Sequence, residues 1–151
     1  MRGIIVSDTS SLIVLKKIDH LEILQKLFGH IIITQKIAEE FNNPLPNFIS
    51  IKNPKDRNYQ KILESFLDEG EASAIALMME TDNSLLIIDD LKGRRQAKSL
   101  GLSYTGIIGI LIIAKEREII GSFSEILDEI KKTDFRLSPQ LIEEAKRKCG
   151  E

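Results

Sequence analysis

Three short runs of apolar, largely β-branched residues impose the strongest constraint on how this chain folds. They lie at residues 3–7, 31–33 and 85–88. Each run is continuously apolar rather than alternating, which is typical of strands buried on both faces of a parallel sheet. The runs therefore predict a central sheet that other elements cover on both sides.

The segments around these runs have helical periodicity. Apolar residues recur at the three- and four-residue spacing of an amphipathic helix in three groups. The groups are Leu21, Leu24, Leu27 and Phe28; Tyr59, Ile62, Leu63, Phe66 and Leu67; and Phe123, Ile126, Leu127 and Ile130. Strand and helix patterns alternate, which predicts one three-layer α/β/α domain over residues 1–151 with a mainly parallel central sheet.

Residues that begin and end helices support these boundaries. Glycine is common just after a helix, whereas serine, threonine and a following proline are common at its start. The candidate boundaries are Gly29 and Gly101 at helix ends, and Thr34, Ser122 and Ser138 at helix starts, the last followed by Pro139. The stretch NNPLPNF at residues 42–48 predicts a loop within the domain.

Composition excludes several classes of protein. Hydrophobic residues make up 42% of the chain and charged residues 29%, which fits neither a disordered nor a membrane protein. The net charge of -2 provides no strong global field toward nucleic acid or lipid. The one cysteine, Cys149, cannot form an internal disulfide. With no signal-peptide pattern and an apolar run at 107–114 that is too short to span a bilayer, we expect a cytoplasmic protein.

Acidic residues follow two of the apolar runs. Asp8 comes directly after the first run, and Asp89 and Asp90 come at the end of the third. Ligands of open parallel sheets bind beyond the carboxyl ends of the strands, so these acids are expected at one binding edge. The alternative is that Asp8 caps a helix starting near Ser10 and that Asp90 caps the next helix along the chain.

Two further acids fall at comparable positions. Glu40 lies beside the buried stripe formed by Ile37 and Phe41, so it is better aimed at the binding edge than its neighbour Glu39. Glu71 lies in the first turn of a mid-chain helix. The alternative for Glu71 is a favourable interaction with the helix dipole, and for Glu39 it is a solvated surface position.

Convergence of these acids would require a cation. The candidate ligands are Asp8, Glu40, Glu71, Asp89 and Asp90. Two carboxylates about 5 Å apart repel each other by roughly 3 kcal/mol at an effective dielectric near 20, so a group of four needs protons or a metal ion. Ligation by oxygen alone suits Mg²⁺ or Mn²⁺. His20 and His30 lie at the ends of predicted elements and form no cluster with the cysteine, so nothing indicates zinc.

Five segments occur in a characteristic order across most of residues 3–116. They are IIVSDTSSL, ITQKIAEEF, GEASAIALM, LLIIDDLKGRRQAKSLGL and TGIIGILIIAK. In order and spacing the chain resembles the PIN-domain nucleases, in particular the small prokaryotic group related to VapC-type toxins. The resemblance implies a metal-dependent ribonuclease with Mg²⁺ or Mn²⁺ as cofactor, RNA as substrate, an antitoxin protein as partner and a homodimeric state.

The resemblance also assigns roles to residues. The five acids match the acidic positions of the family, and Ser10 matches a hydroxyl beside the first acid, where it would orient a carboxylate or water. Glu71 stands where many relatives have aspartate. The pair Asp89 and Asp90 leaves open which of them binds metal and how many ions are bound.

A basic helix follows the aspartate pair. Its cations are Lys92, Arg94, Arg95 and Lys98. They would supply counter-charge to RNA phosphates, or they form a solvated face that pairs with acids.

Two other functions remain open at this point. A non-catalytic binding module of PIN-like fold would need no acid cluster. An aspartyl-phosphate phosphatase would need a second acid two residues after Asp8, where this chain has Ser10.

Overall fold

A five-stranded, entirely parallel sheet forms the centre of the structure, a computed structural model that describes residues 3–151. The strand order is β3-β2-β1-β4-β5. The strands are β1 (Ile5–Ser7), β2 (Ile31–Ile33), β3 (Ile49–Ile51), β4 (Leu85–Ile87) and β5 (Tyr104–Thr105).

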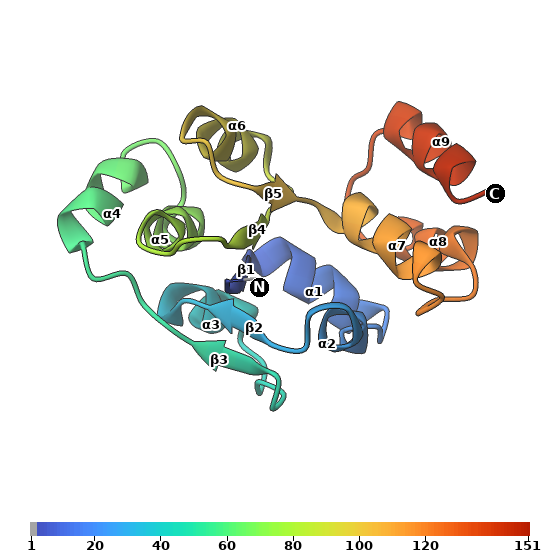
Figure 1. The fold of residues 1–151 in the computed structure, drawn as a ribbon, viewed down its shortest axis with the longest axis horizontal. Coiled ribbons are helices and arrows are strands. Elements are labelled where there is room, and N and C mark those ends of the chain that lie inside the picture. The colour runs from blue at the N-terminus through green and yellow to red at the C-terminus, as the bar shows by residue number, and fades with distance from the viewer. Residues whose placement is uncertain (1–2) are drawn as a thin grey trace.

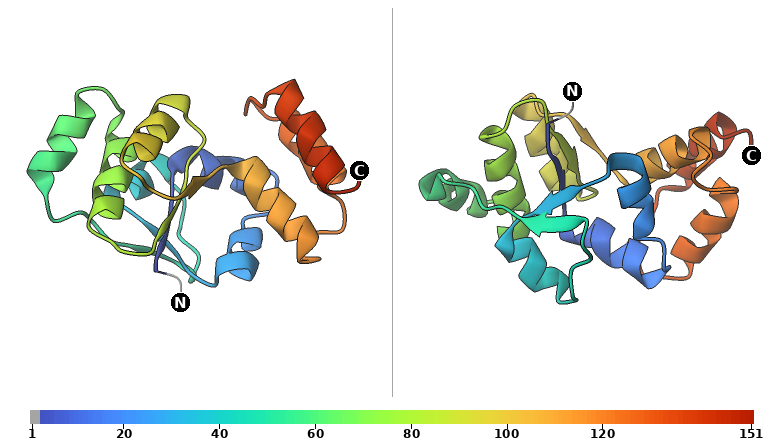
Figure 2. Two further views of the ribbon diagram at one scale, coloured as in Figure 1. Left: turned by 45° about the horizontal axis from the view of Figure 1, so that its top comes forward. Right: turned by 60° about the horizontal axis from the view of Figure 1, so that its bottom comes forward.

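Nine helices within residues 3–151 flank this sheet and complete the predicted α/β/α sandwich. They are α1 (Thr9–Lys17), α2 (Glu22–Phe28), α3 (Gln35–Phe41), α4 (Arg57–Glu64), α5 (Glu69–Met79), α6 (Leu91–Ser99), α7 (Ile107–Glu116), α8 (Phe123–Lys131) and α9 (Pro139–Lys148). Helices α7, α8 and α9 gather at one end of the molecule and α4 lies at the other end (Figures 1 and 2). In the described part of the chain, no helix has the length and apolar character needed to cross a membrane.

The direction of the strand order reverses between β1 and β4. The chain proceeds from β1 through β2 to β3 on one side, and then returns to the other side of β1 for β4 and β5. Ser7 of β1 pairs with Ile87 of β4, so the residues that follow these two strands are neighbours. Such a reversal opens a crevice beyond the carboxyl ends of the strands, which is where ligands of this architecture bind.

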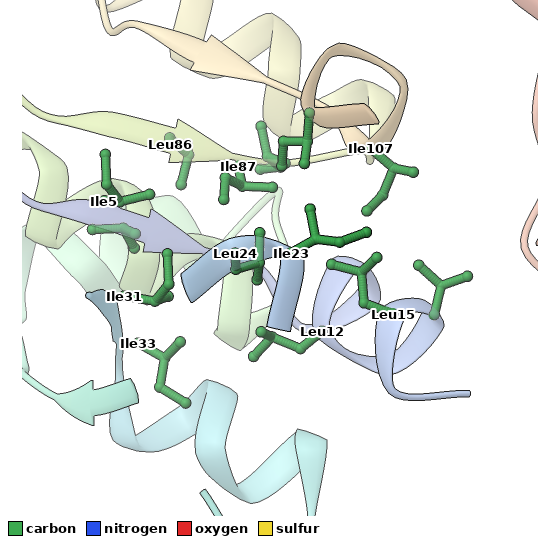
Figure 3. Packing of buried hydrophobic residues seen from close by; sticks show 14 of the residues in the cluster. Ile5, Leu12, Leu15, Ile23, Leu24, Ile31, Ile33, Leu86, Ile87 and Ile107 are labelled. Carbon is green, nitrogen blue, oxygen red and sulfur yellow. The ribbon is translucent and has the colours of Figure 1, made fainter. Parts of the chain in front are cut away.

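Apolar side chains of the first two helices pack against the sheet (Figure 3). Leu12 and Leu15 of α1 and Leu24 of α2 are fully buried, as are Ile31 and Ile33 of β2. All three residues of β1 are buried as well. The continuous apolar runs therefore do form strands with cover on both faces, as the sequence pattern predicts.

The predicted helix boundaries are confirmed at five positions, one of which is Gly101, directly after the C-cap residue of α6. The side chains of Thr34, Ser122 and Ser138 each accept a hydrogen bond from a backbone N–H in the first turn of the next helix. Gly29 ends α2 at a φ of 78°, a left-handed conformation that glycine adopts without steric cost. Two strands are shorter than predicted, at 5–7 and 85–87, although Ile4 and Ile88 still form backbone hydrogen bonds to the neighbouring strands β4 and β5.

The predicted apolar stripe at residues 59–67 is wrong in part. Helix α4 ends at Glu64, and Ile62 and Phe66 are 62% and 48% exposed, whereas Leu63 is buried. Helix α4 lies at the end of the molecule and packs chiefly against α5. One neighbour covers one side of a helix, so the remaining apolar side chains of the stripe face outward.

Candidate active site

Asp8 is buried at the carboxyl end of β1 and uses both carboxylate oxygens. Its Oδ1 accepts a hydrogen bond of 3.0 Å from the Ser11 backbone N–H and thereby caps α1. Its Oδ2 accepts one of 3.0 Å from the Asp89 backbone N–H. Asp8 is therefore a helix cap, as the alternative interpretation holds, and it also joins the ends of β1 and β4. Burial, with a smaller contribution from the Asp89 charge, raises the pKa of Asp8 to about 6.

Asp89 follows β4 and lies beside Asp8. Its carboxylate accepts a hydrogen bond of 2.9 Å from Ser11 Oγ and further hydrogen bonds of 3.3 Å from the Ile107 backbone N–H. Burial raises its pKa, while the hydrogen bonds and the positive charge of Arg94 oppose that shift. The Arg94 guanidinium lies 5.6 Å from the centre of the Tyr104 ring, a cation–π distance that fixes its position.

Glu71 and Asp90 form a second pair of acids. Asp90 caps α6 through a 3.1 Å hydrogen bond from the Gly93 N–H, and Asp68 caps α5 through a 2.8 Å hydrogen bond from the Glu71 N–H. Burial raises the pKa of Glu71 to about 8, with further contributions from the charges of Asp68 and Asp90 and from its hydrogen bond to Asp90. Glu71 therefore retains a proton near neutral pH when no cation is present.

Glu40 reaches the same region from α3. Thr9 Oγ1 donates a hydrogen bond to its carboxylate. Gly70 lies against this carboxylate so closely that a Cβ at position 70 would collide with it. Glu39 instead forms a 3.8 Å ion pair with Lys36. Of the two neighbouring glutamates, Glu40 is thus the one placed among the acids.

One pocket of about 280 Å³ connects these groups. Its lining residues are Asp8, Thr9, Ser10, Ile13, Glu40, Asp68 and Glu71. Asp89 adjoins the pocket through its hydrogen bonds with Asp8 and Ser11, and Asp90 adjoins it through Glu71. We call this set of acids and the pocket that they surround the acid pocket; it lies at the strand-order reversal, where a ligand site is expected.

Comparison with known proteins identifies the family. The model of the family described as "PIN domain" matches residues 4–151. The chain belongs to the PIN-domain family. A search of curated proteins and a search of solved structures gave no significant match. PIN domains are generally nucleases that act on nucleic acid with divalent metals.

Sequence reasoning missed three polar residues of the PIN domain's acid pocket. Asp68 lies three positions before Glu71, a spacing typical of an N-cap followed by an acid in the first turn, and this signal was available. Thr9 and Ser11 carry the hydroxyls that hold Glu40 and Asp89. Ser10 is exposed and lines the pocket, and the hydroxyls that donate to carboxylates there are those of its two neighbours, Thr9 and Ser11.

The four basic residues after the aspartates differ in their surroundings. Lys92, Arg95 and Lys98 are exposed, and no ion pair involves them within residues 3–151. Arg94 is half-buried and acts on Asp89. Of the four, Arg94 acts on an acid of this site, and the other three are exposed on α6; RNA binding by these residues stays a prediction.

The donor set fits a hard divalent cation in its chemistry. All candidate ligands are carboxylates, and burial, more than mutual repulsion, raises the pKa values of Asp8, Glu71 and Asp89, so ionisation of these acids is disfavoured in the metal-free protein. Across residues 3–151, no three His, Cys, Asp or Glu side chains lie in a ready-made arrangement for a metal ion. The acids instead form hydrogen bonds to backbone groups, to hydroxyls and to one another.

Proposed function

We propose that this PIN domain is a metal-dependent ribonuclease that hydrolyses phosphodiester bonds of RNA and acts as the toxin of a toxin–antitoxin pair. The observation that carries the proposal is the acid pocket. Carboxylates from three parts of the chain line one pocket, Asp89 and Asp90 adjoin it, and burial raises the pKa values of Asp8 and Glu71. A stable fold retains such an arrangement at a cost in free energy, which a bound cation offsets.

The proposed metal ligands are carboxylates. Asp8, Glu40, Glu71 and one of the pair Asp89 and Asp90 would hold Mg²⁺ or Mn²⁺. When bound, the ion supplies a water of lowered pKa and neutralises charge that develops on the phosphate.

The remaining polar groups position these acids. Ser11 donates one hydrogen bond to Asp8 from its backbone and another to Asp89 from its hydroxyl, so it fixes the spacing of the two carboxylates. Thr9 restrains Glu40. Ser10, exposed on the pocket wall, would orient a water molecule or a substrate oxygen.

Incubation of the purified protein with RNA tests the proposal. We expect cleavage with Mg²⁺ or Mn²⁺ and none with excess EDTA. Cleavage that EDTA leaves unchanged would contradict the metal-dependent mechanism. Binding of RNA without cleavage in either metal would favour the non-catalytic binding module. The phosphatase alternative has little structural support, because Ser10 occupies the position of the required second acid.

The replacement Gly70→Ala is expected to reduce cleavage with little change in stability. A Cβ at position 70 would collide with the Glu40 carboxylate, which is exposed and free to turn away from the pocket. Displacement of a catalytic group by 1 Å costs on the order of 100-fold in rate. The control is Gly121→Ala, because no atom lies within 4 Å of a Cβ at Gly121. Equal activity of the two variants would show that the position of Glu40 is not critical.

The solvated face of α6 is expected to contribute long-range charge to RNA binding. Lys98→Ala should weaken binding at low salt and reduce the slope of log K against log salt by about 1, because one counterion fewer is released. Lys61, an exposed lysine on α4, provides the control. An unchanged slope for Lys98→Ala would assign this lysine to the solvated surface alone.

The family resemblance also suggests binding partners and a cellular location for the protein. We include in the proposal a homodimer, an antitoxin that places a basic side chain in the acid pocket, and a cytoplasmic site of action. The exposed side chains of Ile62 and Phe66 give apolar area for such contacts. Sedimentation of the purified protein and co-purification from the native host check these points.

A further inference from the structure

A second pocket adjoins the acid pocket along α1. The second pocket has a volume of about 380 Å³ and shares Ser10 and Ile13 with the acid pocket. Its far wall is formed by Asp134 and Phe135 in the connection between α8 and α9. A group bound in the acid pocket is therefore directly followed by a space large enough for a nucleoside.

A third pocket extends the path further. It has a volume of about 320 Å³ and shares Thr133 and Phe135 with the second pocket. Lys131 and Arg136 lie in its lining with one acid, Glu143. We call the three adjoining pockets the α1 groove; along it, carboxylates are followed by an aromatic ring and then by a net positive charge.

The aromatic ring between the pockets is held in place. Thr133 Oγ1 donates a 2.6 Å hydrogen bond to the Ile130 carbonyl and accepts one of 3.1 Å from the Phe135 N–H. A 3.1 Å ion pair between Lys17 and Asp134 ties the same loop to α1. Phe135 itself is half-buried and packs against the core. A fixed aromatic face costs little conformational entropy when a ligand stacks on it.

We propose that the α1 groove is the path of single-stranded RNA beside the cleaved bond. A base next to the scissile phosphate lies against Phe135 and Ile13, and a further phosphate lies near Lys131 and Arg136. This inference rests on the proposed ribonuclease function and adds the course of the RNA strand over the protein surface. A base in a duplex is stacked between its neighbours and cannot lie on a protein ring, so the groove selects unpaired RNA.

The alternation of groups favours RNA over a protein segment as occupant. Aromatic rings that receive bases and cations that receive phosphates are the two components of single-strand recognition. The α1 groove contains both, and it includes the acid pocket, which would act on the backbone. The exposed large apolar side chains that would favour a protein, such as Ile62 and Phe66, lie outside it.

Photo-crosslinking tests the path directly. RNA with 4-thiouridine is irradiated with the Asp8→Asn variant, in which cleavage is expected to stop, and the protein is digested with trypsin. Lys132 and Arg136 make residues 133–136 a single tryptic peptide. We expect the crosslink on this peptide. A crosslink confined to peptides of α6, such as residues 96–98, would overturn the inference.

Affinity measurements with matched variants provide the second test. Phe135→Leu should bind single-stranded RNA roughly 5- to 100-fold more weakly, because the stacking face is lost, and Phe135→Trp should retain binding. Phe66→Leu, at an exposed aromatic on the far side of α5, should bind as the wild type does. For duplex RNA, the three variants should bind alike. Equal affinities of Phe135→Leu and Phe66→Leu for single strands would overturn the inference.

These tests are separable from the test of the ribonuclease proposal. If the wild type cuts no RNA with any divalent metal, that proposal fails whatever the crosslink shows. If it cuts RNA but residues 133–136 carry no crosslink, the function stands and the path is wrong.

Discussion

Asp8→Asn is expected to lower RNA cleavage by 100-fold or more while it makes the metal-free protein more stable. The loss of activity follows from removal of a charged ligand and of its electrostatic contribution. The gain in stability follows from burial of an acid whose pKa is raised to about 6 from 3.8. A cap that served structure alone would give the opposite pair of results.

The size of the stability gain depends on two opposing contributions. A pKa shift of about two units corresponds to about 3 kcal/mol of destabilisation near neutral pH, where Asp8 is ionised. Asparagine removes this charge and still accepts the hydrogen bond from the Ser11 N–H. Its amide nitrogen, however, faces the Asp89 N–H and leaves that donor unpaired, at a cost of about 1–2 kcal/mol. We therefore expect a net gain on the order of 1 kcal/mol.

Thermal melts in EDTA and an RNA-cleavage assay measure both effects. Asp56 offers a matched control, since it caps α4 through a 3.0 Å hydrogen bond from the Tyr59 N–H and is exposed outside the acid pocket. Asp56→Asn should change neither activity nor stability, because asparagine caps about as well as aspartate. If Asp8→Asn, like Asp56→Asn, changes neither activity nor stability, Asp8 is only a helix cap and the proposed metal site is contradicted.

The sequence predicted those features that depend on local pattern and on the order of the strands. The buried strands β1, β2 and β4 appear as continuous apolar runs, and the acids that follow β1 and β4 could be placed at one edge from the parallel order alone. The shared position of Asp8 and Asp89 is a consequence of the pairing of Ser7 with Ile87.

Features that depend on tertiary neighbours could not be predicted in this way. Strand β3 has two exposed residues and β5 has only two residues, so neither contains an apolar run. The stripe on α4 has helical spacing, but only its neighbour α5 decides which of its side chains are buried. Ser10 and Ser11 are equivalent in the sequence, and the rotation of α1 against β4 determines that Ser11 contacts Asp89.

The metal-free protein is expected to lose stability as the pH rises from 5 to 8. The pKa of Asp8 is raised to about 6 and that of Glu71 to about 8, both above the ordinary values of 3.8 and 4.5. Over this range the folded protein binds more protons than the unfolded chain, so its free energy of unfolding decreases as these protons leave. Asp134 and Glu151, whose pKa values are lowered, remain ionised throughout the range and contribute no slope.

A divalent cation should reverse this trend, because it binds the ionised carboxylates of the folded state and takes over the role of the lost protons. In EDTA, Asp8 accounts for about 1.4 kcal/mol of an expected decrease of about 2–3 kcal/mol, which corresponds to a fall in Tm of roughly 5–10 °C. Glu71 contributes less to this decrease in stability than its pKa shift suggests, since it is half-exposed and solvent screens its charge.

Adding excess Mg²⁺ should raise Tm far more at pH 8 than at pH 5. Glu71→Gln should flatten the metal-free curve above pH 7, whereas Asp56→Asn should leave it unchanged. A metal-free Tm that stays constant or rises from pH 5 to 8 would show that ionisation of these buried acids does not destabilise the fold, and would contradict the inferred metal site.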